Sequence, residues 1–118
     1  MDAQALALQF QFQQSERWPA EAILAAQLRQ ASNLIGHARL HVPFHRKRLA
    51  TAPVGAALTA ESFRTIPQMT RNDIQDAGSD LFSRTTPNGH GQAYPVRSSG
   101  STGRPIEVRG NDVTALFM

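Results

Sequence analysis

Several residue types are scarce in this sequence, and each shortage excludes a class of protein. The 118 residues contain no cysteine, which excludes disulfides, thiolate metal sites and cysteine nucleophiles. No apolar run approaches the ~18 residues of a membrane span, and the first residues lack the basic start and apolar core of a secretory signal. Charged residues make up 18% and the formal net charge is +3, too mild for a polybasic protein. We therefore expect one small cytoplasmic domain with no membrane partner.

The N-terminal part of the chain carries helical patterns. Residues 1–15 are rich in Gln and Ala, which suits a helix, while Leu and Phe alternate as in a strand, so we expect a flexible or docking tail. From Trp18 to Val42, apolar residues recur at alternating steps of four and three, which predicts an amphipathic helix of about six turns. Pro19 suits its first position, and Pro43 ends it, because proline disfavours helix at the preceding residue.

The next residues predict short helices separated by irregular segments. Residues 43–57 are expected to form a linker, and residues 59–63 one helical turn. Thr70 is a good N-cap, with Asp73 three residues later in a variant of the capping box. We expect that helix to end near Gly78.

The last segment predicts a hairpin. Residues 85–92 form a turn region, and residues 93–97 and 106–109 are short β-prone runs. Asn111 or Asp112 is expected to cap a further helix.

The loop between the two strands is the most informative stretch. Its two glycines, three residues apart, permit positive φ and let backbone N–H groups converge on an anion. Arg97 and Arg104 supply positive charge that pairs with phosphate oxygens. No G-K-[ST] follows at the spacing of a Walker A loop, and a Ser/Gly-rich stretch is also typical of a flexible linker. The residues alone therefore leave phosphate binding and a linker open for Ser98-Ser99-Gly100-Ser101-Thr102-Gly103-Arg104-Pro105.

This loop resembles the phosphate-binding loop of the adenylate-forming superfamily, the AMP-dependent synthetases and ligases. The resemblance is to the branch that contains phenylacetate-CoA ligase and the CapK proteins. Three upstream segments are similar to that branch in the same order, so the resemblance covers about residues 18–112. They are residues 42–49 (Val-Pro-Phe-His-Arg-Lys-Arg-Leu), 63–67 (Phe-Arg-Thr-Ile-Pro) and 69–74 (Met-Thr-Arg-Asn-Asp-Ile).

The resemblance implies an α+β (mixed α/β) fold that is only part of the family's N-terminal domain. In this interpretation, helices over residues 18–83 precede the first β-hairpin, over residues 93–109. Residues 16–118 would form a partial subdomain that is incomplete at its C-terminal end, because the family's adenylating domain is several times longer than this chain.

The resemblance also implies an ATP-dependent ligase. Such an enzyme uses Mg-ATP to convert a small carboxylate into an acyl-adenylate with release of pyrophosphate, and the acyl group then usually passes to coenzyme A. Arg104 stands where lysine is common in the branch, and it keeps the charge with a different donor geometry. In the family the loop clasps the β- and γ-phosphates, which assigns ATP phosphate binding to Ser98, Ser99, Gly100, Ser101, Thr102, Gly103 and Arg104.

The family's adenine-binding segment, magnesium-binding acid, ribose-binding Asp and catalytic Lys would lie beyond Met118. We therefore expect no catalytic residue and no metal ligand within this chain, and no turnover by the chain alone. The alternative function is a non-catalytic helical interaction module, or the remnant of such a gene, whose amphipathic helix binds a partner.

Two other patterns have less specific interpretations. His37, His41 and His45 are spaced as on one helix face, but Pro43 interrupts that helix, so a polar face is favoured over a metal site. A run of cations without acids suits a solvated surface better than a nucleic-acid interface on so mildly charged a chain. These cations are Arg39, Arg46, Lys47 and Arg48.

Overall fold

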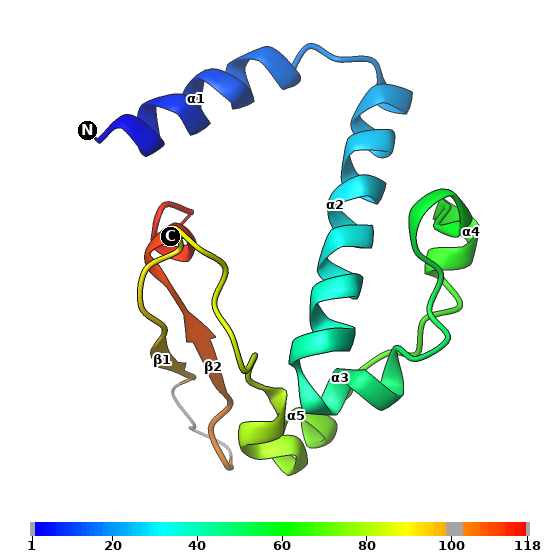
Figure 1. Cartoon of the computed structure of the whole chain (residues 1–118), viewed down its shortest axis with the longest axis vertical. Coiled ribbons are helices and arrows are strands. Elements are labelled where there is room, and N and C mark those ends of the chain that lie inside the picture. Colours follow the sequence, from blue (N-terminus) through cyan, green and yellow to red (C-terminus); the bar gives the residue numbers. More distant parts are fainter. Residues whose placement is uncertain (1, 99–102, 118) are drawn as a thin grey trace.

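A computed structural model describes residues 2–98 and 103–117 of the chain. Over these ranges the protein is built from helices followed by a two-stranded antiparallel sheet, a mixed composition compatible with an α+β fold. Helix α1 crosses one end of the molecule, α2 runs from there to the opposite end, and the hairpin lies across from α2 (Figure 1). The elements are α1 (Ala3–Ser15), α2 (Ala20–His41), α3 (Pro43–Arg48), η1 (Gly55–Ala57), α4 (Ala60–Phe63), α5 (Arg71–Ala77), η2 (Gly78–Leu81), β1 (Tyr94–Arg97), β2 (Glu107–Gly110) and α6 (Asp112–Ala115).

Helix α1 occupies the residues for which the sequence suggested a tail. Its N-cap is Asp2, whose carboxylate accepts a hydrogen bond from the Ala5 N–H at 2.7 Å. Alanine, leucine and glutamine are good helix formers, so composition decides the conformation over the alternation of Leu and Phe. The apolar side chains of α1 remain largely on the surface, with Leu6 53% and Phe10 63% exposed.

Helix α2 confirms the longest helix predicted from the sequence. Its N-cap is Pro19, one position before the predicted place. The helix ends at His41, and Val42 is extended with φ −115° and ψ 108°, as expected for a residue before proline.

The prediction of a linker over residues 43–57 was wrong at its start, where α3 forms. Pro43 is the first residue of α3. A proline there loses no hydrogen bond, because the first N–H groups of a helix have no intrahelical partner. Pro43 therefore ends one helix and begins the next, which makes the corner between α2 and α3.

Helices α4 and α5 both begin at capping boxes. The side chains of Thr59 and Thr70 accept hydrogen bonds from the N–H groups of Ser62 and Asp73, and those two side chains accept in return from the threonine N–H groups. The predicted end of α5 is also confirmed, because Gly78 follows it with φ +53°, a conformation that favours glycine.

The hydrophobic core lies where α2, α3 and the residues after α3 meet. Its buried residues are Ile35, Ala38, Val42, Leu49 and Leu58.

Two hydrogen bonds hold the segment after η2 beside α2. The Arg84 N–H donates to the His41 carbonyl at 2.7 Å, and His37 Nε2 lies 2.9 Å from Ser83 Oγ.

The predicted hairpin is confirmed, and β1 pairs with β2 in antiparallel register. Tyr94 lies opposite Gly110, and Arg97 lies opposite Glu107. The Tyr94 hydroxyl donates to the carbonyl of Asn111 at 3.2 Å. Asn111, one of the two caps considered from the sequence, begins α6 by accepting from the N–H three residues later. No helix in the described part of the chain has both the length and the apolar content that crossing a bilayer requires.

Candidate phosphate-binding site

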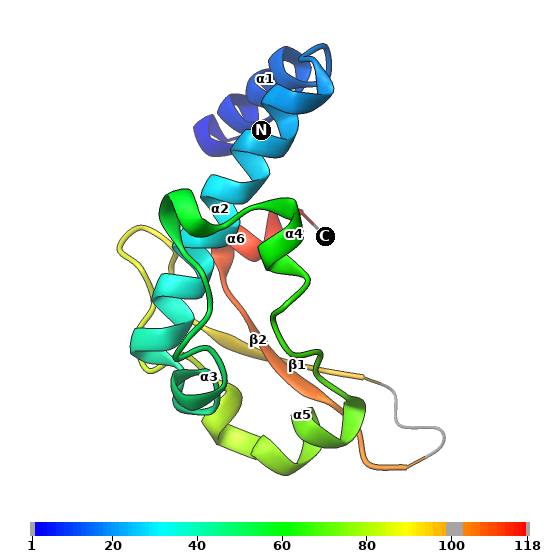
Figure 2. The same cartoon turned by 90° about the vertical axis from the view of Figure 1, so that its right-hand side faces the viewer.

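The loop between β1 and β2 is the candidate site, and two hydrogen bonds close its base. The Ser98 N–H donates to the Ile106 carbonyl at 2.9 Å, and the Ile106 N–H donates to Ser98 Oγ at 2.8 Å. These bonds continue the pairing beyond Arg97 and Glu107, the last paired residues of the strands. The two ends of the loop are thereby held together at the end of the hairpin that lies beside α5 (Figure 2).

The structure describes only the ends of the predicted phosphate-binding loop. Ser98, Gly103 and Arg104 are all exposed. Gly103 has φ +145°, and no neighbouring atom lies within 4 Å of the place of a Cβ, so backbone conformation rather than space favours glycine there. The remaining predicted residues lie outside the described part of the chain: Ser99, Gly100, Ser101 and Thr102.

Helix α5 supports the returning arm of this loop. Gln75 Nε2 and Arg71 Nη2 donate to the carbonyl of Arg104 at 2.5 Å and 3.3 Å. The Arg104 side chain in turn pairs with Asp76, with 3.0 Å between Nη2 and Oδ1. The sequence does not predict this support. The available signal was the capping box at Thr70, which fixes the start of α5 and places Arg71 and Gln75 four residues apart on one helix face.

The cations at both ends of the loop are paired with carboxylates. Arg97 Nε lies 3.0 Å from Glu107 Oε2, and Arg109 Nη2 lies 3.6 Å from Glu107 Oε1. The Arg104 and Asp76 side chains are 66% and 71% exposed. Such exposed pairs contribute about 0–1 kcal/mol, so an anion of higher charge can replace the carboxylate of Asp76.

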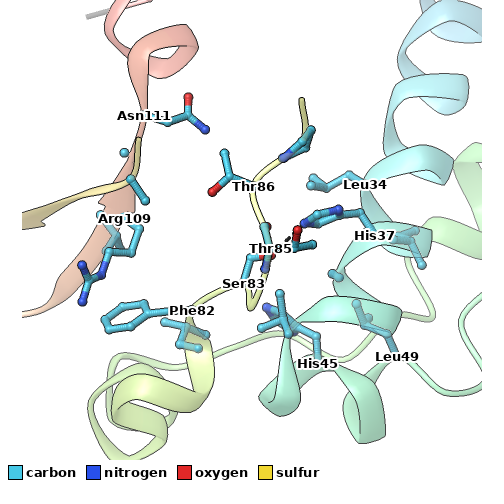
Figure 3. A pocket seen from close by; sticks show the side chains of 18 residues that line it. Leu34, His37, His45, Leu49, Phe82, Ser83, Thr85, Thr86, Arg109 and Asn111 are labelled. Atoms are coloured by element: carbon cyan, nitrogen blue, oxygen red, sulfur yellow. Dashed lines mark hydrogen bonds between the residues drawn. The ribbon is translucent and has the colours of Figure 1, made fainter. Parts of the chain in front are cut away.

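A separate open cavity of about 510 Å³ lies between α2 and β2 (Figure 3). Leu34 and Leu49 line it from the helical side, and Phe82 and Arg109 from the opposite side. The Arg109 guanidinium carbon lies 4.5 Å from the centre of the Phe82 ring, a cation–π distance. The cavity combines apolar walls with one cation and is distinct from the predicted loop.

Two histidines on the helical side of this cavity favour the neutral form. Burial, followed by the positive charges that His41 and His90 would carry, lowers the pKa of His37. Burial and the neighbouring Arg48 lower the pKa of His45. Because both shifts disfavour protonation, these imidazoles act as neutral hydrogen-bonding groups at neutral pH.

The histidine spacing noted in the sequence is split by the corner at Pro43. His37 and His41 lie on α2 with ring centroids 4.8 Å apart, whereas His45 lies on α3 against the Phe44 ring. Within residues 2–98 and 103–117, no group of three or more His, Asp or Glu side chains is arranged to hold a metal ion.

Most of the basic run near α3 is used inside the fold. The Arg39 guanidinium donates to the Ala52 carbonyl at 2.6 Å, and the Arg46 guanidinium donates to the Leu40 carbonyl at 3.3 Å. Arg48 donates to the carbonyl of Pro67. Arg39 and Arg48 thereby hold loop residues against α2 and α3, and Arg46 joins α3 to the last turn of α2.

Comparisons with protein-family models, curated proteins and solved structures give no match to this chain. A Gly- and Ser-rich loop closed between two strands, with arginine at each end, can bind an anion through N–H groups, hydroxyls and guanidinium groups.

Proposed function

We propose that residues 93–109 bind the phosphates of ATP as part of an adenylate-forming ligase of the phenylacetate-CoA ligase branch. Such a ligase joins a small carboxylate to AMP and releases pyrophosphate, and the acyl group then passes to the thiol of coenzyme A. A carboxylate is a poor acyl donor, and AMP is a good leaving group. The contribution of this loop would be to bind the polyphosphate and to stabilise the charge that develops as pyrophosphate departs.

The observation that carries the proposal is the hairpin itself. The segment Ser98–Pro105 lies between two paired strands, and the reciprocal bonds of Ser98 and Ile106 close its base. A flexible linker, the other interpretation of the same residues, does not require paired strands on both sides. The three upstream segments that resemble the same branch support this assignment independently of the loop.

The described residues fit a polyphosphate better than a metal ion. Arg104 offers a guanidinium in an exposed and exchangeable pair, and Gly103 has a conformation that favours glycine. By contrast, the described ranges hold no metal-binding cluster. We therefore propose phosphate contacts for the described residues of this loop.

Binding of nucleotide to the 118-residue chain tests the proposal. Isothermal titration calorimetry should detect binding of Mg-ATP, and inorganic tripolyphosphate should compete with it. Thr102→Val removes one hydroxyl of the loop at nearly constant volume and should weaken binding about tenfold or more, because a hydrogen bond to a charged group contributes about 1.5–3 kcal/mol. The matched control is Thr51→Val, because Thr51 is an exposed threonine far from the hairpin in sequence. Equal effects of the two substitutions, or no binding of Mg-ATP, would contradict the proposal.

A second candidate is a helical interaction module, and exposed apolar surface on the helices favours it. Leu34 and Leu40 of α2 are both 68% exposed. Exposed apolar surface of this kind favours a contact surface, because large apolar patches usually mark sites of interaction. The two candidate functions predict different results in the calorimetric titration described above. A module that acts only through its helices would leave tripolyphosphate unbound, and Thr102→Val would change nothing.

A further inference from the structure

We propose that Asp76 of α5 competes with bound polyphosphate for the Arg104 guanidinium and so sets the anion affinity of the hairpin loop. The inference rests on the proposed phosphate-binding function and adds a residue outside the loop that determines its affinity. In this scheme Asp76 acts through Arg104, and anion binding breaks the ion pair between them.

The backbone of Arg104 is held independently of its side chain. Gln75 and Arg71 both donate to the Arg104 carbonyl, at 2.5 Å and 3.3 Å. Asp76 contacts only the guanidinium of Arg104, at 3.0 Å. The guanidinium can therefore leave Asp76 while the two hydrogen bonds from α5 keep the end of the loop in place.

The pair between Arg104 and Asp76 is also suited to exchange. Both side chains are mostly exposed, at 66% and 71%, and in the described part of the chain each forms no other side-chain hydrogen bond. A phosphate group carries more charge than one carboxylate and accepts the same two-donor fork of arginine. A polyphosphate bound to the loop therefore replaces a weak internal partner with a stronger external one.

Removing the carboxylate of Asp76 should raise anion affinity. In Asp76→Asn the guanidinium no longer has to leave an ion pair, so we expect tripolyphosphate to bind roughly two- to fivefold more tightly, the range that one exposed pair supports. Structural damage would lower affinity rather than raise it. Asp76→Glu, which keeps the charge, should return the affinity toward that of the wild type.

The matched control is Asp80→Asn. Asp80 is 64% exposed and pairs with Arg84 at 3.2 Å, so its substitution makes the same change in net charge at a similar surface pair. Calorimetric titration with tripolyphosphate at low salt should show a larger gain for Asp76→Asn than for Asp80→Asn. Circular dichroism should show that both variants remain folded.

A double substitution tests whether Asp76 acts through Arg104. Arg104→Ala should weaken tripolyphosphate binding, and Asp76→Asn should add nothing in that background. Equal gains from Asp76→Asn and Asp80→Asn, or a full gain from Asp76→Asn without Arg104, would overturn the inference and leave the proposed function standing. Failure of both the wild type and Asp76→Asn to bind tripolyphosphate would overturn the two together.

Discussion

A single methyl group at Gly110 should destabilise the hairpin that carries the candidate site. Gly110 is the last residue of β2 and lies opposite Tyr94. A Cβ at this position would lie 2.8 Å from Cε2 and 2.9 Å from Cζ of the Tyr94 ring. The ring is held in place, because its hydroxyl donates to the Asn111 carbonyl at 3.2 Å. Gly110→Ala therefore requires the ring or the strand to move.

The size of the effect follows from the kind of contact. Forcing an extra carbon into a packed contact costs about 1–3 kcal/mol, and we expect Gly110→Ala to lower the free energy of unfolding by that amount. Gly36→Ala is the matched control, because Gly36 lies within α2 and no atom outside that helix's own nearby backbone lies within 4 Å of its Cβ position. Alanine favours helix over glycine by about 1 kcal/mol. The same substitution should therefore stabilise at one site and destabilise at the other, a separation of about 2–4 kcal/mol.

Urea unfolding followed by far-ultraviolet circular dichroism measures both variants. Amide exchange of the strand N–H groups reports on the hairpin separately from the helices. If Gly110→Ala is as stable as the wild type, or if both variants shift in the same direction, the close packing of Tyr94 on residue 110 is wrong. Replacing Tyr94 with leucine should remove most of the cost of Gly110→Ala, since the clash is with the ring.

Three further predictions concern the core and the titratable groups. Leu58 is 4% exposed, so Leu58→Ala should cost about 2–5 kcal/mol in urea unfolding, whereas Leu40→Ala, at a position 68% exposed, should stay within about 0.5 kcal/mol. Hydrogen bonds from Thr70 lower the pKa of Asp73, so the ionised carboxylate stabilises the fold above about pH 4, and this contribution is lost as the pH falls further. Asp73→Asn should therefore reduce the loss of stability at acid pH, measured as unfolding midpoints against pH. The lowered pKa of His37 means that the unfolded chain takes up its proton first, so stability should fall as the pH drops below about 6.5; His37→Gln should reduce that fall, and proton NMR titration of the ring should show the lowered pKa directly.

The features predicted correctly from the sequence are those set by nearby residues. Thr70 and Asn111 cap helices because each side chain meets an N–H only three residues away. Gly78 ends α5 because it reaches a conformation that other residues avoid. The hairpin follows from two β-prone runs on either side of a Gly-rich loop, and its register is completed by the bond between Ser98 and Ile106.

The features that the sequence did not predict depend on position within a larger structure. The sequence predicts Pro43 only as the end of α2, yet this residue also begins α3. Leu49 and Leu58 pack with residues of α2 in the core and support that second helix. The support of Arg104 by α5 was missed because the partners lie 28 to 33 residues apart in sequence. No local rule connects residues at that separation, and only the fold brings them together.

The docking of α5 on the returning arm of the hairpin also orders the steps of folding. Helix α5 and the hairpin each form from residues close in sequence, and such elements form in microseconds. Contacts between them span 28 to 33 residues, so they require a larger loop to close first. The entropic cost of closing a loop grows slowly with its length, by only about 0.6 kcal/mol for each doubling. The length of this connection therefore has a small effect on the stability of the folded protein and a larger effect on the order in which its contacts form. We therefore expect the end of the loop at Arg104 to gain its support from α5 after local structure in the strands and the helix has begun to form, and we expect that local structure to become stable only when the two dock.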